Sequence, residues 1–412
     1  MRRASPFVLA RAARYARGLG GCAMLAALSC SACAGTTLRE GGHVSTDARA
    51  YFGPARFADQ KSGNGLSLRM EPELSVQSES EEHTVTLHPF IRMDPADEQR
   101  THYDLRQADY VFATGPLTTG VGVGLFSWGV LEAHKLVDII NQSDLVEDIG
   151  GSEKLGQPYV GSGLSGESWS LRALYLPYSR DRTFPGDEGR LRFPLVVDTD
   201  QPQYESSLAR FHPGFAGRGS ISVGELDLGL SAFAGLSREP RFYAQLTERA
   251  VIPRYEQLRH VGVDAQWTHE ALSLKLEATA RTWSTTFRPS AGIGGGLEYS
   301  FFDIGPFGYD LTLVGEYYWD NRPLDAPVTL YDHDAFGGFR FALNDDSDTM
   351  LLAGMLVDVD TGFSSLQVSA SRRLGERWRL FLEGRGFFGP EGILESSLLS
   401  DDYAQLRVAY YF

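Results

Sequence analysis

Cysteine is nearly absent from this chain of 412 residues. The three cysteines, Cys22, Cys30 and Cys33, all lie within the first 34 residues. Removal of that segment would leave a chain without thiols, which excludes disulfide bonds, zinc fingers and thiol catalysis. A long exported protein without disulfides must be stabilised in another way, and a closed ladder of backbone hydrogen bonds is one such way.

Residues 1–34 have the organisation of a secretory signal. Five arginines precede or border an apolar stretch from Leu19 to Leu28, and Ala32-Cys33-Ala34 is a small-x-small cleavage site. The apolar stretch is too short to cross a bilayer as a helix. We therefore predict a signal peptide at residues 1–34 and a mature chain at residues 35–412. Lipidation at Cys30 is the alternative, although Ala27 stands where such sites usually have leucine.

Long hydrophobic runs and an excess of basic charge are also missing. No later stretch approaches the ~20 consecutive apolar residues of a membrane helix. Without the five arginines of the signal, 33 basic residues face 53 acidic ones, a net charge of −20. This charge argues against nucleic acid as a partner. It fits either ordinary loop solubility or loops that hold divalent cations over lipopolysaccharide.

The chain does contain many segments of about ten residues in which apolar and polar residues alternate. The clearest runs from Leu272 to Arg281, where leucines and alanines alternate with serine, lysine, glutamate, threonine and arginine. Because side chains alternate across a strand, one face of this segment is apolar and the other carries three charges. Similar segments begin at Leu226, Val261, Leu311, Leu366 and Trp378.

The number and composition of these segments favour a membrane barrel over a soluble sandwich. About 16 to 18 of them fit in the chain, and their polar faces carry charges of both signs, as a wet lumen would. Aromatic residues at segment ends, such as Trp283 and Tyr317-Tyr318-Trp319, resemble interfacial girdles. A sheet in lipid leaves no edge unpaired. We predict an all-β fold: a transmembrane antiparallel up-and-down β-barrel of about 16–18 strands.

The final segment, from Ala404 to Phe412, alternates in the same way and ends in phenylalanine. This pattern is read by the outer-membrane assembly machinery. We therefore predict an integral protein of the cell outer membrane, with outer-membrane lipid, lipopolysaccharide and that machinery as partners. Val44 to Phe52 is the candidate first strand. Short hinges then face the periplasm, and the long loops at residues 129–158 and 179–206 face outward.

Several sequence blocks carry a family resemblance. They are Phe126-Ser127-Trp128-Gly129-Val130, Leu136 through Leu145, Lys154 through Pro158, Tyr175-Leu176-Pro177 with Arg182 through Gly186, and Arg372-Arg373-Leu374-Gly375 with the closing Tyr410-Tyr411-Phe412. In these blocks the chain resembles a family of proteobacterial outer-membrane porin-like proteins with no assigned biochemical function. The resemblance implies a barrel in the outer membrane and brings no catalytic residues.

The connection at residues 129–158 is the most informative irregular segment. Leu131 to Val146 has a helix-like mixture of residues, so we predict a partly helical loop. Its acidic residues are Glu132, Asp138, Asp144, Glu147 and Asp148. Loops of this length in compact domains are often functional. Two interpretations stay open: the loop folds into the lumen and constricts a pore, or it is an extracellular cap on the rim.

The polar strand faces predict a set of pore-lining charges. They are Lys275, Glu277, Arg281, Arg373, Arg379, Glu383 and Arg385. Rings of charge tune pore selectivity, whereas internal salt bridges would fill a narrow barrel instead. If the three C-terminal arginines of this set face the acidic loop, a transverse field across a constriction results.

Enzymatic signals are weak. The Gly161-Ser162-Gly163 segment lacks the spacing of a nucleophile elbow, and the Asp332-His333-Asp334 run is interpreted as a solvated loop rather than a metal site. We predict no enzymatic activity, no metal and no cofactor. The Gly292-Gly294-Gly296 alternation lacks the lysine and helix of a phosphate loop, so we interpret it as close backbone packing in the lumen.

The leading hypothesis is a porin-like channel for passive or substrate-selective diffusion of small solutes. One alternative is a transporter of hydrophobic compounds, since Phe336, Phe381 and Phe387 lie on otherwise polar faces. The other is a structural or adhesive surface barrel with a plugged lumen. Conductance in planar bilayers separates these alternatives.

Overall fold

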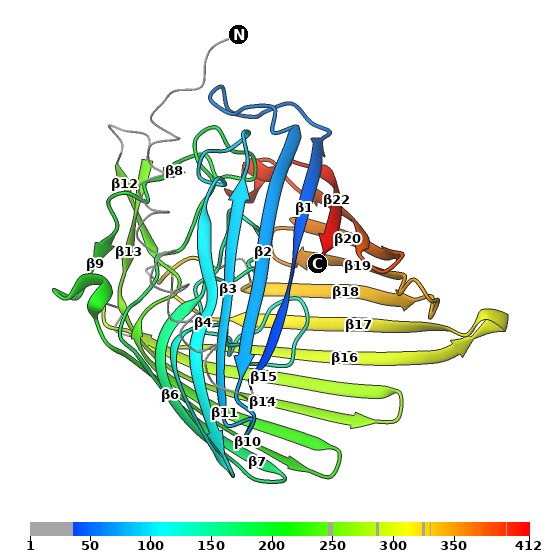
Figure 1. The fold of residues 1–412 in the computed structure, drawn as a ribbon. Helices are drawn as coiled ribbons and strands as arrows, with labels where there is room; N and C mark the ends of the chain where they lie inside the picture. The colour runs from blue at the N-terminus through cyan, green and yellow to red at the C-terminus, as the bar shows by residue number, and fades with distance from the viewer. Residues whose placement is uncertain (1–35, 246–249, 286–287, 324–325, 330, 393) are drawn as a thin grey trace.

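Eighteen antiparallel strands close into one barrel in the computed structural model, which describes residues 36–245, 250–285, 288–323, 326–329, 331–392 and 394–412 (Figure 1). The predicted signal peptide lies outside the described residues. The barrel strands are β1 (Thr37–Tyr51), β2 (Gly65–Gln77), β3 (His83–Met93), β4 (Tyr103–Thr114), β5 (Leu117–Gly124), β6 (Gln157–Ser165), β7 (Trp169–Leu176), β10 (Gly214–Val223), β11 (Leu226–Leu236), β14 (Gln257–His269), β15 (Leu272–Trp283), β16 (Ser290–Ile304), β17 (Tyr309–Asp320), β18 (His333–Ala342), β19 (Met350–Asp358), β20 (Ser364–Leu374), β21 (Trp378–Phe388) and β22 (Tyr403–Tyr411).

Each barrel strand pairs with its neighbours in chain order, and β22 pairs with β1 to close the sheet. Across this seam Thr46 lies opposite Val408, and Asp47 lies opposite Arg407. The predicted first strand at Val44–Phe52 is confirmed, although it begins earlier, at Thr37. Closure satisfies the backbone hydrogen bonds of every strand, which lipid requires. The prediction of a transmembrane up-and-down barrel is thereby confirmed.

The alternation within β15 shows how the sequence selects the two faces of the wall. Leu274 and Leu276 point outward and are 42% and 47% exposed, whereas Glu277 points into the lumen and is fully buried. The outer face of the wall is therefore apolar and the inner face is polar. This arrangement suits a wall that has lipid outside and water or protein inside. Two aromatic residues that the sequence assigned to the girdles, Trp283 and Tyr318, instead point inward and are fully buried.

A second, smaller sheet forms in the long connections between barrel strands. It consists of β8 (Val196–Val197), β9 (Gln203–Tyr204), β12 (Arg241–Gln245) and β13 (Ala250–Tyr255). The strands β8 and β9 pair in parallel with β13, so the connection after β7 and the connection after β11 fold together at one end of the barrel. In the part of the chain that the structure describes, the remaining short elements are three 3₁₀ turns, η1 (Ala209–Phe211), η2 (Gly305–Phe307) and η3 (Leu394–Leu398).

The connection between β5 and β6 differs from the predicted partly helical loop. Residues 129–158 are all described, and no α-helix forms among them. Turns and two isolated bridges, Ser143 with Lys154 and Asp144 with Thr183, organise it instead. Its apolar residues pack against the barrel wall on several sides, so no single helical stripe is needed. Within the described residues, no helix is long and apolar enough to cross a membrane.

Candidate functional site

The connection between β5 and β6, residues 125–156 (hereafter the crossing loop), folds into the barrel and reaches opposite sides of its wall. On β4, the guanidinium of Arg106 contacts the Asp144 carboxylate at 2.8 Å. On β17, the Glu316 carboxylate accepts hydrogen bonds from the backbone N–H groups of Glu132 and Ala133, at 2.6 and 2.9 Å. These two wall strands are nine places apart in the 18-stranded circuit. The crossing loop therefore spans the lumen.

Carboxylates of the wall hold the tip of the crossing loop through its backbone. Glu277 on β15 accepts hydrogen bonds from the N–H groups of Val130, Leu131 and Val137, at 2.6, 3.0 and 3.1 Å. On β17, the Tyr318 hydroxyl accepts the N–H of His134 at 3.0 Å. Buried backbone N–H groups need partners. These contacts supply them to a segment that has no secondary structure of its own.

Glycines in the wall make room for the loop tip. The Cβ of any other residue at Gly294 would lie 2.5 Å from Leu131 Cδ1 and 3.3 Å from Leu136 Cδ1, and a Cβ at Gly296 would lie 3.0 Å from Leu131 Cδ2. The alternating glycines of β16 thus let these leucines reach the sheet itself. This confirms the interpretation of the Gly292-Gly294-Gly296 pattern as close packing in the lumen.

A matched pair of substitutions on β16 tests this packing. We expect Gly294→Val to lower the free energy of unfolding by roughly 1–3 kcal/mol, because an added side chain must displace Leu131 from a packed site. Gly295→Val is the control, since a Cβ there meets no atom within 4 Å. Urea unfolding of the folded barrel measures both. Equal effects of the two substitutions would show that the loop tip does not rest on the wall.

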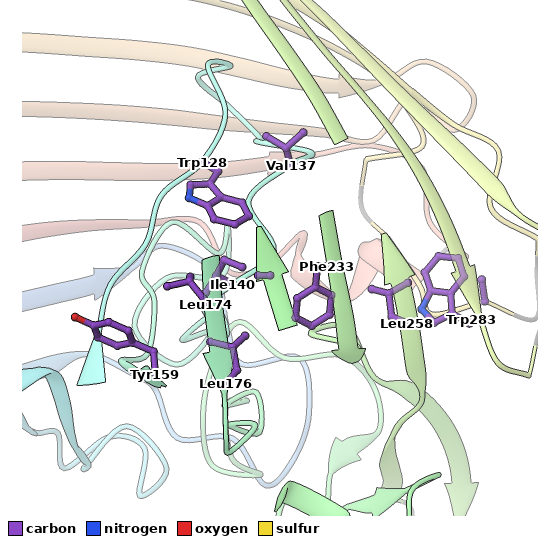
Figure 2. Packing of buried hydrophobic residues seen from close by; sticks show 11 residues of the cluster. Trp128, Val137, Ile140, Tyr159, Leu174, Leu176, Phe233, Leu258 and Trp283 are labelled. Atoms are coloured by element: carbon purple, nitrogen blue, oxygen red, sulfur yellow. The ribbon is translucent and has the colours of Figure 1, made fainter. Parts of the chain in front are cut away.

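Apolar residues of the crossing loop join a buried cluster inside the barrel. Trp128, Val137 and Ile140 pack with inward side chains from β6, β7, β11, β14 and β15 (Figure 2). The wall members labelled in the figure are Tyr159, Leu174, Leu176, Phe233, Leu258 and Trp283. Burial of this much apolar surface stabilises the inserted position of the loop.

The returning half of the loop carries three of the predicted acidic residues, and each meets an arginine of the wall. Asp144 pairs with Arg106 of β4, Glu147 pairs with Arg92 of β3 at 2.7 Å, and Asp148 pairs with Arg385 of β21 at 2.7 Å. All three carboxylates are shielded from solvent. Their charges are therefore compensated by direct contact and hold the loop in place.

The other two predicted acidic residues lie nearer the tip. Glu132 remains about a third exposed and pairs with Arg340 of β18 at 2.7 Å. Asp138 accepts a long hydrogen bond of 3.5 Å from the backbone N–H of Trp128, and burial raises the pKa of its carboxyl. The structure thus brings all five acidic residues into the lumen, but four of them at separate contacts with the wall and Asp138 at a contact within the loop, rather than as one ring.

The contact between Asp144 and His102 makes the anchorage of the loop sensitive to pH. The Asp144 carboxylate lies 3.3 Å from His102 Nε2. Burial alone would raise the pKa of Asp144, but His102 and Arg106 outweigh it and lower this pKa to about 2. Burial alone would lower the pKa of His102, but the hydrogen bond and charge of Asp144 outweigh it and the pKa is raised above 6.5.

We therefore expect the anchorage to be strongest between the ordinary pKa of aspartate and that of histidine. The contribution of His102 is complete below pH 6.5 and is lost as the pH rises through its raised pKa. The contribution of Asp144 is lost as the pH falls toward 2. Hydrogen exchange of the backbone amides of residues 143–148 measures this. In His102→Gln, the loss of protection above pH 6.5 should disappear.

The predicted pore-lining charges face inward but differ in environment. Lys275 pairs with Glu298, and Arg281 pairs with Asp320 at 2.6 Å. Glu383 accepts the hydroxyl of Tyr403. Glu277 and Arg385 hold the crossing loop. With Arg373 and Arg379, which pair with Asp348, all seven are therefore in ion pairs or loop contacts of the kind that the internal salt-bridge alternative describes.

The proposed transverse field is not supported by the positions of its arginines. Arg373 and Arg379 both face Asp348 at the end of the barrel with short turns, at 3.9 and 2.9 Å. Only Arg385 among the three meets the acidic loop in the described residues, and it touches Asp148 directly. Direct pairing neutralises both charges, so no extended field arises between them.

One arc of the inner wall remains accessible beside the crossing loop. From β3 to β17 the inward side chains near the loop, such as Arg92, Phe233 and Tyr318, are buried. From β18 to β22 most inward side chains are only partly buried. They include Phe336, Leu352, Ser365, Gln367, Ser369, Ser371, Phe381, Glu383 and Arg407. A cavity of about 290 Å³ opens against β19–β22 on this arc.

Sequence reasoning missed the wall residues that receive the loop. Nothing in the local sequence distinguishes Arg92, Arg106 and Glu316 from other charges on the inner strand faces. Each of these residues is a charged residue in the middle of a strand, on the strand face that also carries other charges. This pattern predicts that the side chain points into the lumen, but it does not predict which loop contacts it.

No protein-family model matches this chain, and no curated protein matches its sequence. Solved structures do match it. Wzi, an outer-membrane protein of Escherichia coli that is involved in group 1 capsule assembly and is a carbohydrate-binding β-barrel, aligns with a TM-score of 0.54 at 10% identity, over 90% of this chain and 85% of its own. OmpT of Vibrio cholerae, an outer-membrane protein, aligns in a loop-deletion form with a TM-score of 0.50 at 8% identity, over 92% of this chain and all of its own. The chain has the fold of an outer-membrane β-barrel.

Proposed function

We propose that this protein is a selective channel of the outer membrane, through which small solutes diffuse past the crossing loop along the β18–β22 wall. The observation that carries the proposal is the difference between the two arcs of the wall. The loop covers the arc from β3 to β17 with most of its ion pairs and apolar contacts. The arc from β18 to β22, which the loop meets at Arg340 and Arg385, keeps accessible inward side chains and a cavity of about 290 Å³. Barrels of 16–18 strands are wide enough for an aqueous path.

Conductance of the purified full-length mature protein in planar bilayers tests the proposal. We expect stable ohmic steps, smaller than those of a barrel of the same strand number without an inserted loop. Absence of steps, from protein whose folded state is verified by its heat-modifiable mobility in gels, would overturn the channel.

The second candidate is a surface barrel with a plugged lumen, which binds a partner instead of conducting. Its support is the interlocking of connections at the end of the barrel with long loops. Arg190, between β7 and β10, contacts Asp401, between β21 and β22, at 2.6 Å, and the amide of Gln60, between β1 and β2, donates to Gly189 O at 3.0 Å. The similarity to Wzi, a carbohydrate-binding barrel, also supports it.

The transporter of hydrophobic compounds receives less support. Phe387, one of the three phenylalanines behind it, is buried against Leu191, Leu398 and Tyr403 and offers no surface to cargo. We propose that the protein is not an enzyme and that its partners are lipid, lipopolysaccharide and diffusing solutes.

A further inference from the structure

The accessible arc contains an aromatic ring in an unusual setting. Phe381 of β21 faces the lumen between two guanidinium groups, those of Arg379 at 5.5 Å and Arg407 at 5.8 Å from the ring centroid. Cation–π contacts at this range hold a ring in position. Phe381 is nevertheless partly exposed, and it lines the cavity of about 290 Å³. A fixed apolar face is therefore presented to whatever enters.

The groups around this ring are polar and of both hydrogen-bonding kinds. Ser369 and Ser371 supply hydroxyls, Glu383 supplies a carboxylate that also accepts the Tyr403 hydroxyl, and the largely buried Gln405 supplies an amide whose oxygen accepts Arg49 Nε–H at 2.8 Å. A pocket with one apolar wall and a few convergent polar groups is the usual form of a small-molecule site. The ligand that fits has one C–H face and hydroxyls around its edge.

The charges of the cavity select against an anion. Arg407 already contacts Asp47 at 2.8 Å, and Arg379 contacts Asp348 at 2.9 Å. The remaining ionised group of the cavity wall, the Glu383 carboxylate, lies 3.7 Å from Arg385 Nε, so both charges that line the cavity already have a partner of opposite sign. Desolvation of an anion here would thus be poorly repaid, whereas neutral hydroxyls can be satisfied by the serines, the amide and the carboxylate.

We propose that the β20–β22 wall around Phe381 is a subsite for neutral saccharides, with a sugar ring stacked on Phe381 and its hydroxyls bonded to Ser369, Glu383 and Gln405. This proposal rests on the proposed channel in one respect: the subsite would lie on the path along which solutes diffuse. Neutral saccharides would then be the class of solute that the constricted lumen selects.

Calorimetric titration of the full-length mature protein in detergent with maltose tests the subsite without any need for current. Phe381→Ala should weaken maltose binding by roughly tenfold or more, because stacking on an aromatic face is lost. Leu380→Ala is the matched control. It removes a side chain of similar size from the preceding position of the same strand, which points outward and does not line the cavity, and it should leave binding unchanged.

A second variant separates a saccharide from an anionic aromatic ligand. If the site binds saccharides, Glu383→Gln should weaken maltose binding, because a hydrogen-bond acceptor is lost. If the site instead prefers anions, the same substitution should strengthen the binding of benzoate. Absence of maltose binding, an unchanged affinity in Phe381→Ala, or tighter binding of benzoate than of maltose would each overturn the inference. Ohmic channels without maltose binding would refute the subsite alone, and maltose binding without current would refute the channel alone.

Discussion

Removal of the crossing loop is expected to raise the single-channel conductance by roughly threefold or more, because an 18-stranded barrel without an inserted loop leaves an open aqueous lumen. The variant joins Gly124 to Gln157 through a short glycine–serine link. These residues face each other at the end of the β5–β6 ladder, so a tight hairpin can connect them without disturbing either strand. Planar-bilayer recordings of the variant and the wild type give the ratio directly.

The control for this deletion keeps the loop and changes an exposed side chain in it. Ser152→Ala removes one hydrogen bond to Asp148 and should leave the conductance unchanged. Heat-modifiable mobility of the deletion variant verifies that its barrel is closed. A closed barrel with the conductance and ion selectivity of the wild type would contradict the view that the loop restricts the path.

Arg92→Ala is expected to lower the free energy of unfolding by about 3–5 kcal/mol, since removal of one partner from a buried ion pair leaves uncompensated charge. The side chain of Arg92 is fully buried and contacts Asp47 at 2.6 Å and Glu147 at 2.7 Å. Its loss would leave two carboxylates of the same sign in the same buried place. Urea unfolding in lipid vesicles measures the change.

Arg372→Ala provides the matched comparison on the same barrel. Arg372 also pairs with an aspartate, Asp345, at 2.9 Å, but its side chain is about half exposed. Solvent screens such a pair and holds each charge well without its partner. We expect no change in the free energy of unfolding. If both arginine variants behaved alike, the network around Arg92 would not be what anchors the loop.

The wall of the barrel could be predicted from the sequence. Whether a side chain faces the lumen or the lipid depends only on its position in the alternation of its own strand. The alternation from Leu272 to Arg281 is a local pattern, and it placed Lys275, Glu277 and Arg281 on the inner face correctly. The same rule could have corrected the girdle assignment. Trp283 is separated from Arg281 by one residue and must therefore face inward, although its position at a segment end is typical of a girdle residue.

The crossing loop could not be predicted to the same degree because its conformation depends on distant residues. The helix-like composition of Leu131 to Val146 is a local signal. The conformation of the loop is instead determined by its hydrogen bonds to Glu277 and Glu316, which lie more than a hundred positions further along the chain. Wall glycines were the exception. The β16 pattern indicated close packing in the lumen, although the leucines that fill the space were not foreseen.

The anchors of the crossing loop also set an order of assembly. Arg92 precedes the loop in the chain, Glu277 follows it at the middle, and Arg385 lies 237 positions after Asp148. Long-range contacts of this kind form late in folding. A chain that has built β3 and β4 can already pair Glu147 with Arg92 and Asp144 with Arg106, but the tip of the loop and Asp148 become fixed only when β15, β17 and β21 arrive. Membrane sealing and strand closure would then be completed together, so an unfinished barrel would leak more than a finished one.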